Sequence, residues 1–385
     1  MSYRGKLAGS ASKRLLAIDG GGIRGILALE ILAEIERQLG NGRPGFRLSH
    51  YFDYIAGTST GGIVAAGLAM GMSVAEILEF YRAAGAQMFE KASLLKRLHF
   101  KFEDEPLARQ LKTVLGGDTC LGSERLQTLV MLVLRNATTD SPWPVCNNPF
   151  AKYNDPKRPD SNLKLPLWQL VRASTAAPTF FPPEVMQVGE RSFIFVDGGV
   201  TMYNNPAFQL FLMATVDRYW PFAPEGQRGW ATGVDRMLVV SVGTGTSPSA
   251  NAQLAPEQLH LLFNAATIPS ALMFAALNEQ DFLCRVFGDC LAGDPLDREV
   301  GDMIGSSGPL SREGKLFTYL RYNAELTREG LEALGCGDIA PETVQKLDSV
   351  AGMPELSRVG KAAARKVRPE HFARFPAEIS STIAV

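Results

Sequence analysis

Three glycines, an acid and an arginine lie close together near the start of the chain and could serve either of two chemistries. The segment LLAIDGGGIRG, residues 15–25, ends an apolar run at Asp19 and then turns through glycines. Gly20, Gly22 and Gly25 have the G-x-G-x-x-G spacing of a dinucleotide-binding turn. The same backbone amides could instead face the oxyanion of a tetrahedral intermediate in acyl transfer. The two interpretations make different demands on the rest of the chain.

A serine between glycines supplies a candidate nucleophile. In GTSTG, Ser59 lies between Gly57 and Gly61, which is the G-x-S-x-G pattern. In a nucleophile elbow the glycines are needed because side chains there would clash with the adjoining strand and helix. Ordinary Gly/Ser turns also match this pattern. Here, however, an apolar segment precedes the turn and a small-residue helix follows it, which favours the elbow.

A nucleophilic serine needs a base, and Asp197 is the strongest candidate. In FIFVDGGV it ends a strand and is followed by Gly198 and Gly199, a position at which α/β folds place reactive side chains. A carboxylate can itself act as the base where apolar surroundings raise its pKa. The downstream histidines, His260 and His371, adjoin no short strand or glycine turn. We interpret them as part of a helix face and of a basic tail.

The missing acid decides between the two interpretations of the first turn. A dinucleotide site requires an acidic residue about 20 positions after the glycines. The segment around residues 40–48 offers none, and Glu34 and Glu36 lie inside a predicted helix. We therefore expect an oxyanion site, with amides at a helix N-terminus. Arg24, at the start of this helix, could hold a phosphate or order the loop.

Strands that alternate with helices must position these residues. Residues 15–18 predict a short buried strand, and the apolar spacing from Ile23 predicts a helix that Gly40 ends. A second strand, turn and helix surround Ser59. Further helices are predicted at 74–90, at 104–115 and in the segment before Pro178, and further strands in SFIFVD and RMLVVSV.

This alternation favours an α/β sheet covered by helices on both faces. The Pro-, Asn- and Asp-rich segment 141–162 predicts a loop. LQTLVMLVLRNA is compatible with a strand or a buried helix. From about residue 250 the chain is expected to be mainly helical.

Composition excludes several classes of protein. The chain has 385 residues, is 46% hydrophobic and carries a formal net charge of -1, which argues against a nucleic-acid binder. Its five cysteines are an odd number without tight spacing, so neither a disulfide framework nor a zinc site is predicted. No apolar run is long enough for a membrane span, and no signal peptide is evident. We expect a cytoplasmic protein.

Three motifs in order, DGGGIRG, GTSTGG and DGG, resemble those of the patatin-like phospholipases. The segments RASTAAPTFFPP, NNP and SVGTG also look like parts of that family, and the resemblance covers roughly residues 14–325. It implies a patatin-like three-layer fold with a central, mostly parallel sheet. It also implies lipid acyl hydrolysis by a Ser-Asp dyad, without a catalytic histidine, a metal or a cofactor.

Carried over residue by residue, the resemblance makes Ser59 the nucleophile and Asp197 the general base. Gly21 and Gly22 would supply oxyanion amides, and Gly20 would shape the turn. The implied substrate is membrane phospholipid. Ser59 would attack a fatty ester, and water would then release the fatty acid from the acyl-enzyme.

Three domain-level expectations accompany this interpretation. Residues 1–13 form a flexible arm, residues 14–325 the patatin-like domain, and residues 326–385 a helical extension packed on the core.

Two segments could contact lipid: residues 94–102, with interleaved basic and apolar side chains, and residues 261–277, as a lid or a buried helix. The basic tail predicts a solvated helix face, formed by Arg358, Lys361, Arg365 and Arg368. The alternatives for this face are attraction to a membrane surface and capture of an anionic ligand.

The sequence indicates the regulation of the protein and its binding partners less directly. The compact chain is similar to bacterial patatin-like effectors of anti-phage defence that cyclic nucleotides switch on. We therefore expect a cyclic nucleotide activator, a homo-oligomer and peripheral association with the inner membrane. The alternatives are a non-lipid carboxylesterase and a catalytically silent patatin fold that serves as a binding module.

Overall fold

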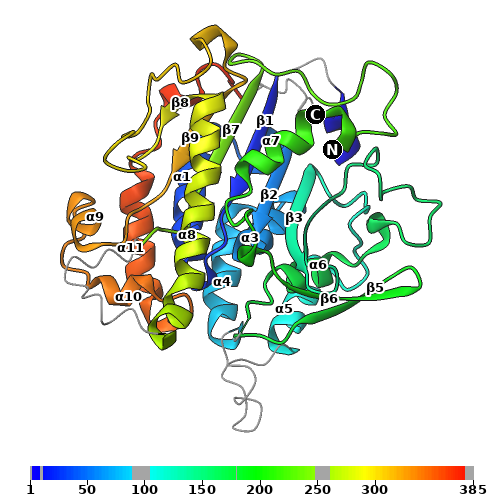
Figure 1. Ribbon diagram of the computed structural model, residues 1–385, viewed down its shortest axis with the longest axis horizontal. Coiled ribbons are helices and arrows are strands. Elements are labelled where there is room, and N and C mark those ends of the chain that lie inside the picture. Colours follow the sequence, from blue (N-terminus) through cyan, green and yellow to red (C-terminus); the bar gives the residue numbers. More distant parts are fainter. Residues whose placement is uncertain (1, 9–11, 89–104, 179, 248–260, 378–385) are drawn as a thin grey trace.

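The computed structural model describes residues 2–8, 12–88, 105–178, 180–247 and 261–377 (Figure 1). They build one nine-stranded sheet in the order β5-β6-β3-β2-β1-β7-β9-β8, with β4 also paired to β3. The strands are β1 (Lys13–Ile18), β2 (Tyr54–Thr58), β3 (Leu129–Asn136), β4 (Ser141–Cys146), β5 (Glu184–Val188), β6 (Arg191–Asp197), β7 (Met237–Val242), β8 (Gly288–Ala292) and β9 (Phe317–Tyr322).

The centre of the sheet is parallel and lies between two layers of helices. The run from β3 through β2, β1, β7 and β9 to β8 is parallel, whereas β4, β5 and β6 pair antiparallel. Every residue of β1, β7 and β9 is buried, as expected for parallel strands covered on both faces. The predicted mostly parallel α/β fold is confirmed.

Figure 1 shows α7 and α8 in front of the sheet and α1 and α11 behind it. The helices of the described chain are α1 (Gly25–Gly40), α2 (Leu48–Tyr51), α3 (Thr60–Ala69), α4 (Val74–Met88), α5 (Glu105–Leu115), α6 (Leu167–Ser174), α7 (Ala207–Thr215), α8 (Leu261–Phe287), α9 (Arg328–Ala333), α10 (Pro341–Gln345) and α11 (Met353–Ala364). None of them combines the length and apolar character needed to cross a bilayer.

One prediction about local structure was wrong. The start of the predicted loop 141–162 is strand β4, although it contains Pro142 and Pro144. Prolines are tolerated there because β4 pairs only with β3 and is an edge strand. After residue 250 the regular structure of the described chain is mainly helical, as expected, and β8 and β9 extend the sheet beyond β7. Residues 129–136, for which the sequence allows a strand or a buried helix, form strand β3.

Both ends of the described chain are tied to the core. Tyr3, in the segment expected to be a loose arm, is fully buried, and its backbone N–H donates to the Leu126 carbonyl. An aromatic side chain that finds a pocket can anchor an otherwise polar terminus. At the other end α11 packs along α1, where Ser357 Oγ donates to Glu30 Oε1 at 2.5 Å.

Candidate active site

Strand β3 acts as the template that brings the two catalytic candidates together. On the edge opposite β4, β3 pairs first with β2 and then, beyond the end of β2, with β6. Thr58 pairs with Val133, and Asp197 pairs with the next residue, Leu134. Ser59 and Asp197, 138 positions apart in sequence, therefore meet where β2 and β6 both end.

Ser59 has the backbone conformation of a nucleophile elbow. Its φ of 54° and ψ of −124° lie outside the regions that L-residues ordinarily occupy, and α3 begins at the next residue. The turn is closed by contacts that only glycine permits. A Cβ on Gly57 would lie 2.0 Å from the Gly61 carbonyl oxygen, and one on Gly61 would lie 2.3 Å from that of Ile18. The motif glycines are therefore explained by close packing.

The serine and the aspartate form a direct hydrogen bond. Ser59 Oγ donates to Asp197 Oδ2 at 2.6 Å, and the Gly199 N–H donates to Oδ1 at 2.6 Å. Burial raises the pKa of Asp197 to about 6, although both hydrogen bonds and the positive charge of Arg172 oppose the shift. At neutral pH the carboxylate is ionised yet basic enough to accept a proton. Gly198, which begins the short 3-10 helix Gly198–Val200, is buried behind it.

Ser174, which sequence reasoning did not single out, supports the elbow. Its hydroxyl accepts a hydrogen bond from the Ser59 N–H at 2.9 Å and donates to the Val133 carbonyl at 2.7 Å. It thus ties the strained residue to β3 and satisfies a buried amide. The only signal for it was its place in RASTAAPTFFPP, one of the segments that carried the family resemblance.

The glycine turn after β1 lies beside the dyad, but its amides have different partners. The Gly20 N–H donates to the Asn204 carbonyl at 3.1 Å, so it belongs to the scaffold of the turn. The Gly21 N–H donates to Thr60 Oγ1 at 3.1 Å, an acceptor that a substrate oxygen could replace. An amide already committed to a backbone carbonyl is a poorer candidate for an oxyanion donor than one held by a hydroxyl.

Gly22 connects this turn to the C-terminal extension. It has a φ of +59°, and a Cβ there would lie 2.2 Å from the Leu347 carbonyl oxygen. The same carbonyl accepts the Ile23 N–H at 2.8 Å. Residues far beyond the glycine motif therefore fix the orientation of the turn.

Arg24 and Gly25 complete the motif. Arg24 lines the cavity in front of Ser59, and burial lowers its pKa to about 10, so the guanidinium keeps its charge at neutral pH. Gly25 begins α1 and packs against Tyr81, whose hydroxyl would lie 2.9 Å from a Cβ at that position.

The cavity in front of the dyad has a volume of about 570 Å³. Ser59, Asp197 and the three glycines are among its lining residues, and most of its wall is apolar. Met273 of α8 also lines it, so the apolar segment 261–277 contributes to the wall of the cavity. The apolar part of the lining is formed by Ile63, Leu107, Ala177, Pro178, Phe180, Phe181, Val200, Met273 and Leu347.

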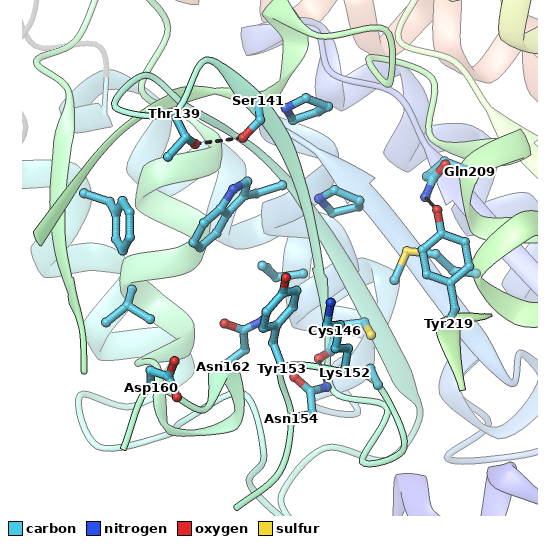
Figure 2. A pocket seen from close by; sticks show the side chains of 18 of the residues that line it. Thr139, Ser141, Cys146, Lys152, Tyr153, Asn154, Asp160, Asn162, Gln209 and Tyr219 are labelled. Carbon is cyan, nitrogen blue, oxygen red and sulfur yellow. Dashed lines mark hydrogen bonds between the residues drawn. The ribbon is translucent and has the colours of Figure 1, made fainter. Parts of the chain in front are cut away.

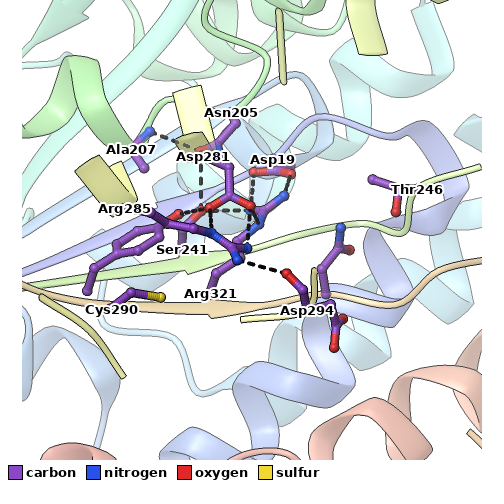
Figure 3. Close-up of polar contacts among 12 residues, drawn as sticks. Asp19, Asn205, Ala207, Ser241, Thr246, Asp281, Arg285, Cys290, Asp294 and Arg321 are labelled. Carbon is purple, nitrogen blue, oxygen red and sulfur yellow. Dashed lines mark hydrogen bonds and ion pairs between the residues drawn. The ribbon is translucent and has the colours of Figure 1, made fainter. Parts of the chain in front are cut away.

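A buried ionic network lies beneath the glycine turn (Figure 3). Asp19, the acid of DGGG, accepts two hydrogen bonds from Arg321 of β9, at 2.6 and 3.0 Å. Arg321 also lies 3.7 Å from Asp281 of α8, which in turn binds Arg285. A buried acid is stable only when paired, and here the pairing attaches the turn to α8 and β9. No spacing rule in the sequence indicates partners this distant.

Histidines and metal ligands contribute nothing to this site in the described part of the chain. His371 lies beside Tyr322, with 2.8 Å between the hydroxyl and Nδ1, and neither it nor His50 lines the cavity. His99, His260 and the basic segment 94–102 lie outside the described residues. Among the residues described, no group of three or more His, Cys, Asp or Glu side chains could hold a metal ion.

Comparison with known proteins agrees with this geometry. A family model described as "Patatin-like phospholipase" matches residues 16–211. Patatin-like protein 1 of Arabidopsis thaliana is 30% identical over 321 residues, which cover 73% of this chain and 75% of the plant protein. A cGAMP-activated phospholipase of Vibrio cholerae is 31% identical over 210 residues, 51% of this chain and 56% of that protein.

An intracellular phospholipase A2 of Caenorhabditis elegans is 31% identical over 251 residues, which cover 64% of this chain and 20% of that protein. The chain thus spans three quarters of its plant relative, about half of the bacterial one and a fifth of the nematode one. With its three motifs gathered around one cavity and more than half of its length matched, the chain belongs to the patatin-like phospholipase family of lipid acyl hydrolases.

Proposed function

We propose that the chain hydrolyses fatty acyl esters of phospholipids through a covalent acyl-enzyme formed on Ser59. The observation that carries the proposal is the 2.6 Å hydrogen bond from Ser59 Oγ to a buried carboxylate whose pKa is raised to about 6. As Ser59 Oγ attacks the ester carbonyl, Asp197 Oδ2 accepts its proton. The lysolipid alkoxide then leaves with that proton, and the acyl group remains on Ser59.

Water completes the cycle by the same route. Asp197 accepts a proton from the attacking water and returns it to Ser59 Oγ as the acyl–serine bond breaks, so that fatty acid is released and the dyad is restored. We assign the oxyanion donors to the Gly21 and Gly22 amides, since the Gly20 amide is held by Asn204. One such donor is worth roughly 2.7–4 kcal/mol of transition-state stabilisation. Gly21 must exchange Thr60 Oγ1 for the substrate oxygen as the intermediate forms.

The cavity suits one acyl chain and one phosphate. Its apolar wall can take the chain, and Arg24 contributes a guanidinium that makes no ion pair within the described residues. We propose that Arg24 binds the substrate phosphate, because guanidinium and phosphate form charge-assisted hydrogen bonds. Arg24→Gln should lower kcat/KM for phospholipid about tenfold and leave that for an uncharged ester nearly unchanged. Equal losses on both substrates would contradict this role.

We further propose that a cyclic nucleotide activates the enzyme in defence against phage and that it then acts at the inner membrane. This second proposal is favoured by the relatives in Vibrio cholerae and Escherichia coli that are named cGAMP-activated phospholipases. Their similarity covers about half of this chain, so activation has to be tested directly.

The deciding experiment measures fatty-acid release from phospholipid vesicles by the purified chain and by Ser59→Ala. Ser192→Ala, at an exposed serine, is the matched control. We expect release by wild type and by Ser192→Ala, and background release by Ser59→Ala. Equal release by all three would sink the Ser59 assignment. Release from short soluble esters but not from vesicles would indicate a non-lipid esterase. If a serine-directed probe failed to label Ser59, the chain would be a catalytically silent binding module.

A further inference from the structure

A second cavity, larger than the catalytic one, opens on the opposite side of the segment that follows Asp197. Its volume is about 700 Å³, within the range of small-molecule sites, and it shares no lining residue with the catalytic cavity. Strand β4, the loop after it, β6 and the end of α7 contribute to its wall. Figure 2 shows Tyr153 and Asn162 on one side and Tyr219 with Gln209 on the other.

The wall offers aromatic surfaces that can stack on planar groups. Tyr153 is 53% exposed and Tyr219 36%, although large aromatic side chains are normally buried. Trp143 and Phe193 also line the cavity and pack against each other with ring centroids 5.4 Å apart. Stacking on such surfaces is a common way for proteins to hold nucleobases.

Three cations face the same space without an acidic partner. Lys152, Arg191 and Arg218 line the cavity, are exposed, and make no ion pair within the described residues. The acid that lines it, Asp160, is already neutralised by two hydrogen bonds from Arg158, at 2.7 and 2.8 Å. The cavity is therefore electropositive, and its charge complements an anion that carries more than one negative charge.

Polar groups that can read a base edge are also present. The side-chain amide of Asn162 makes no hydrogen bond within the described residues. Gln209 Nε2 donates to the Tyr219 hydroxyl at 3.1 Å, which leaves the phenolic hydrogen for another acceptor. Aromatic surfaces, several cations, one free amide and one free phenolic hydrogen together match a nucleotide better than they match a fatty chain.

The wall between the two cavities is a single short segment. The Tyr203 side chain lines the second cavity, while its carbonyl accepts a hydrogen bond at 2.7 Å from Thr58 Oγ1, next to Ser59. The adjacent Asn204 lines the catalytic cavity, and its carbonyl accepts the Gly20 N–H. A ligand that moves Tyr203 therefore acts on the elbow and on the glycine turn together.

We propose that this second cavity binds a cyclic dinucleotide, with bases on its aromatic surfaces and phosphates at its cations, and that Tyr203 and Asn204 transmit occupancy to the dyad. The transmission rests on the proposed lipase function, whereas binding does not. The cavity thus becomes a regulatory site distinct from the site of acyl transfer.

The test titrates the full chain with cGAMP and cyclic di-AMP by calorimetry, in the absence of lipid. Lys152→Ala and Arg218→Ala each remove one exposed cation from the cavity, and Lys157→Ala removes an exposed cation outside it. We expect at least one dinucleotide to bind, about tenfold more weakly to each cavity variant and unchanged to Lys157→Ala. Added salt should weaken binding to wild type more than to the variants.

Several outcomes would overturn the proposal. If neither dinucleotide binds, or if all three variants bind as wild type does, the cavity is not a nucleotide site. If AMP or pyrophosphate binds as tightly as the dinucleotides do, the assigned ligand class is wrong. If a dinucleotide binds here but leaves fatty-acid release by wild type unchanged, the transmission step fails. Because the titration needs no hydrolysis, failure of the Ser59 assignment would leave its result readable.

Discussion

The two cavities of this protein differ in whether the backbone or exposed side chains define them. In the catalytic cavity, backbone geometry defines the site: a strained Ser59, a carboxylate at a strand end and glycines packed against carbonyls. In the second cavity, exposed side chains from separate segments supply the chemistry, and their cations make no ion pair among the described residues. The first site is organised before substrate arrives, whereas the exposed side chains of the second would be ordered by the ligand that we propose.

This difference has energetic consequences. A preorganised site lowers the stability of the folded state, because strained residues and buried charges are unfavourable until the reaction uses them. A site of exposed side chains costs little to keep and instead orders its side chains when a ligand binds. Substitutions in the two cavities should therefore differ in what they do to stability, and that contrast can be measured.

The largest effect is expected from Asp197→Asn, which should lower kcat about 10²–10⁴-fold because it removes the base. It should also stabilise the fold. The pKa of Asp197 rises from 3.8 to about 6 on folding, so the folded state binds more protons between these pH values and stability falls as pH rises through about 6. The free energy of unfolding of the variant should exceed that of wild type by up to about 3 kcal/mol at pH 8. Below pH 4 the two proteins should be equally stable.

Denaturant unfolding at pH 4 and pH 8 checks this prediction. Ser192→Ala, which removes an exposed hydroxyl, should show no such dependence of its stability difference on pH. If Asp197→Asn is less stable than wild type at pH 8, the buried carboxylate does not destabilise the fold. The proposed contrast between the cavities is then wrong.

A similar effect on activity is expected from Gly22→Ala, which tests the glycine turn. The new Cβ would meet the Leu347 carbonyl and would also have to adopt a φ of +59°. Gly42→Ala is the matched control, because Gly42 has a φ of +73° but no atom within 4 Å of its Cβ position. We expect both to lose about 1–2 kcal/mol of stability from strain. Gly22→Ala should lose more, because its Cβ also meets the Leu347 carbonyl, and it alone should lose about 10²-fold or more in kcat.

Equal kinetic effects of the two glycine variants would show that the turn is not held by the C-terminal extension. Thermal unfolding separates the two contributions, because strain lowers Tm in both variants whereas displacement of the oxyanion amides lowers kcat in one.

The candidate active site could be located from the sequence because backbone constraints leave patterns at short spacing. Gly57 and Gly61 lie two residues either side of Ser59, and Gly198 and Gly199 follow Asp197 directly, so both patterns can be seen in the sequence although Gly61 packs against the distant Ile18 carbonyl. The central strands and helices were found for the same reason, since apolar periodicity is local. The family resemblance then supplied the roles of the residues.

What remained hidden depends on distant partners. Arg321 meets Asp19 across 302 positions, and Ser174 meets Ser59 across 115, with no spacing rule to link them. Strand β4 was missed because prolines in an edge strand resemble a loop. The second cavity left no motif at all, since its aromatic and basic residues come from separate loops and strands.

A smaller effect is expected on the pH profile. Since Asp197 must be ionised to accept the Ser59 proton and its pKa is about 6, kcat/KM should be flat above pH 7 and fall about tenfold per unit below pH 6. The measurement uses an uncharged, detergent-dispersed ester, so that the charge of the lipid surface does not change. A midpoint near 4 would mean that the carboxylate is solvated during turnover and that burial does not tune it.

The smallest expected effect is a difference in stability between one substitution near each cavity. Ser174→Ala leaves the buried Ser59 N–H and the Val133 carbonyl without partners, so we expect a loss of about 1–3 kcal/mol in the free energy of unfolding. Lys152→Ala removes an exposed cation whose described contact is with the Tyr153 ring, and it should change stability by less than about 0.5 kcal/mol. Denaturant unfolding of both variants measures the difference. A large loss from Lys152→Ala would mean that the second cavity is itself a rigid part of the core, and ligand binding could then not order it.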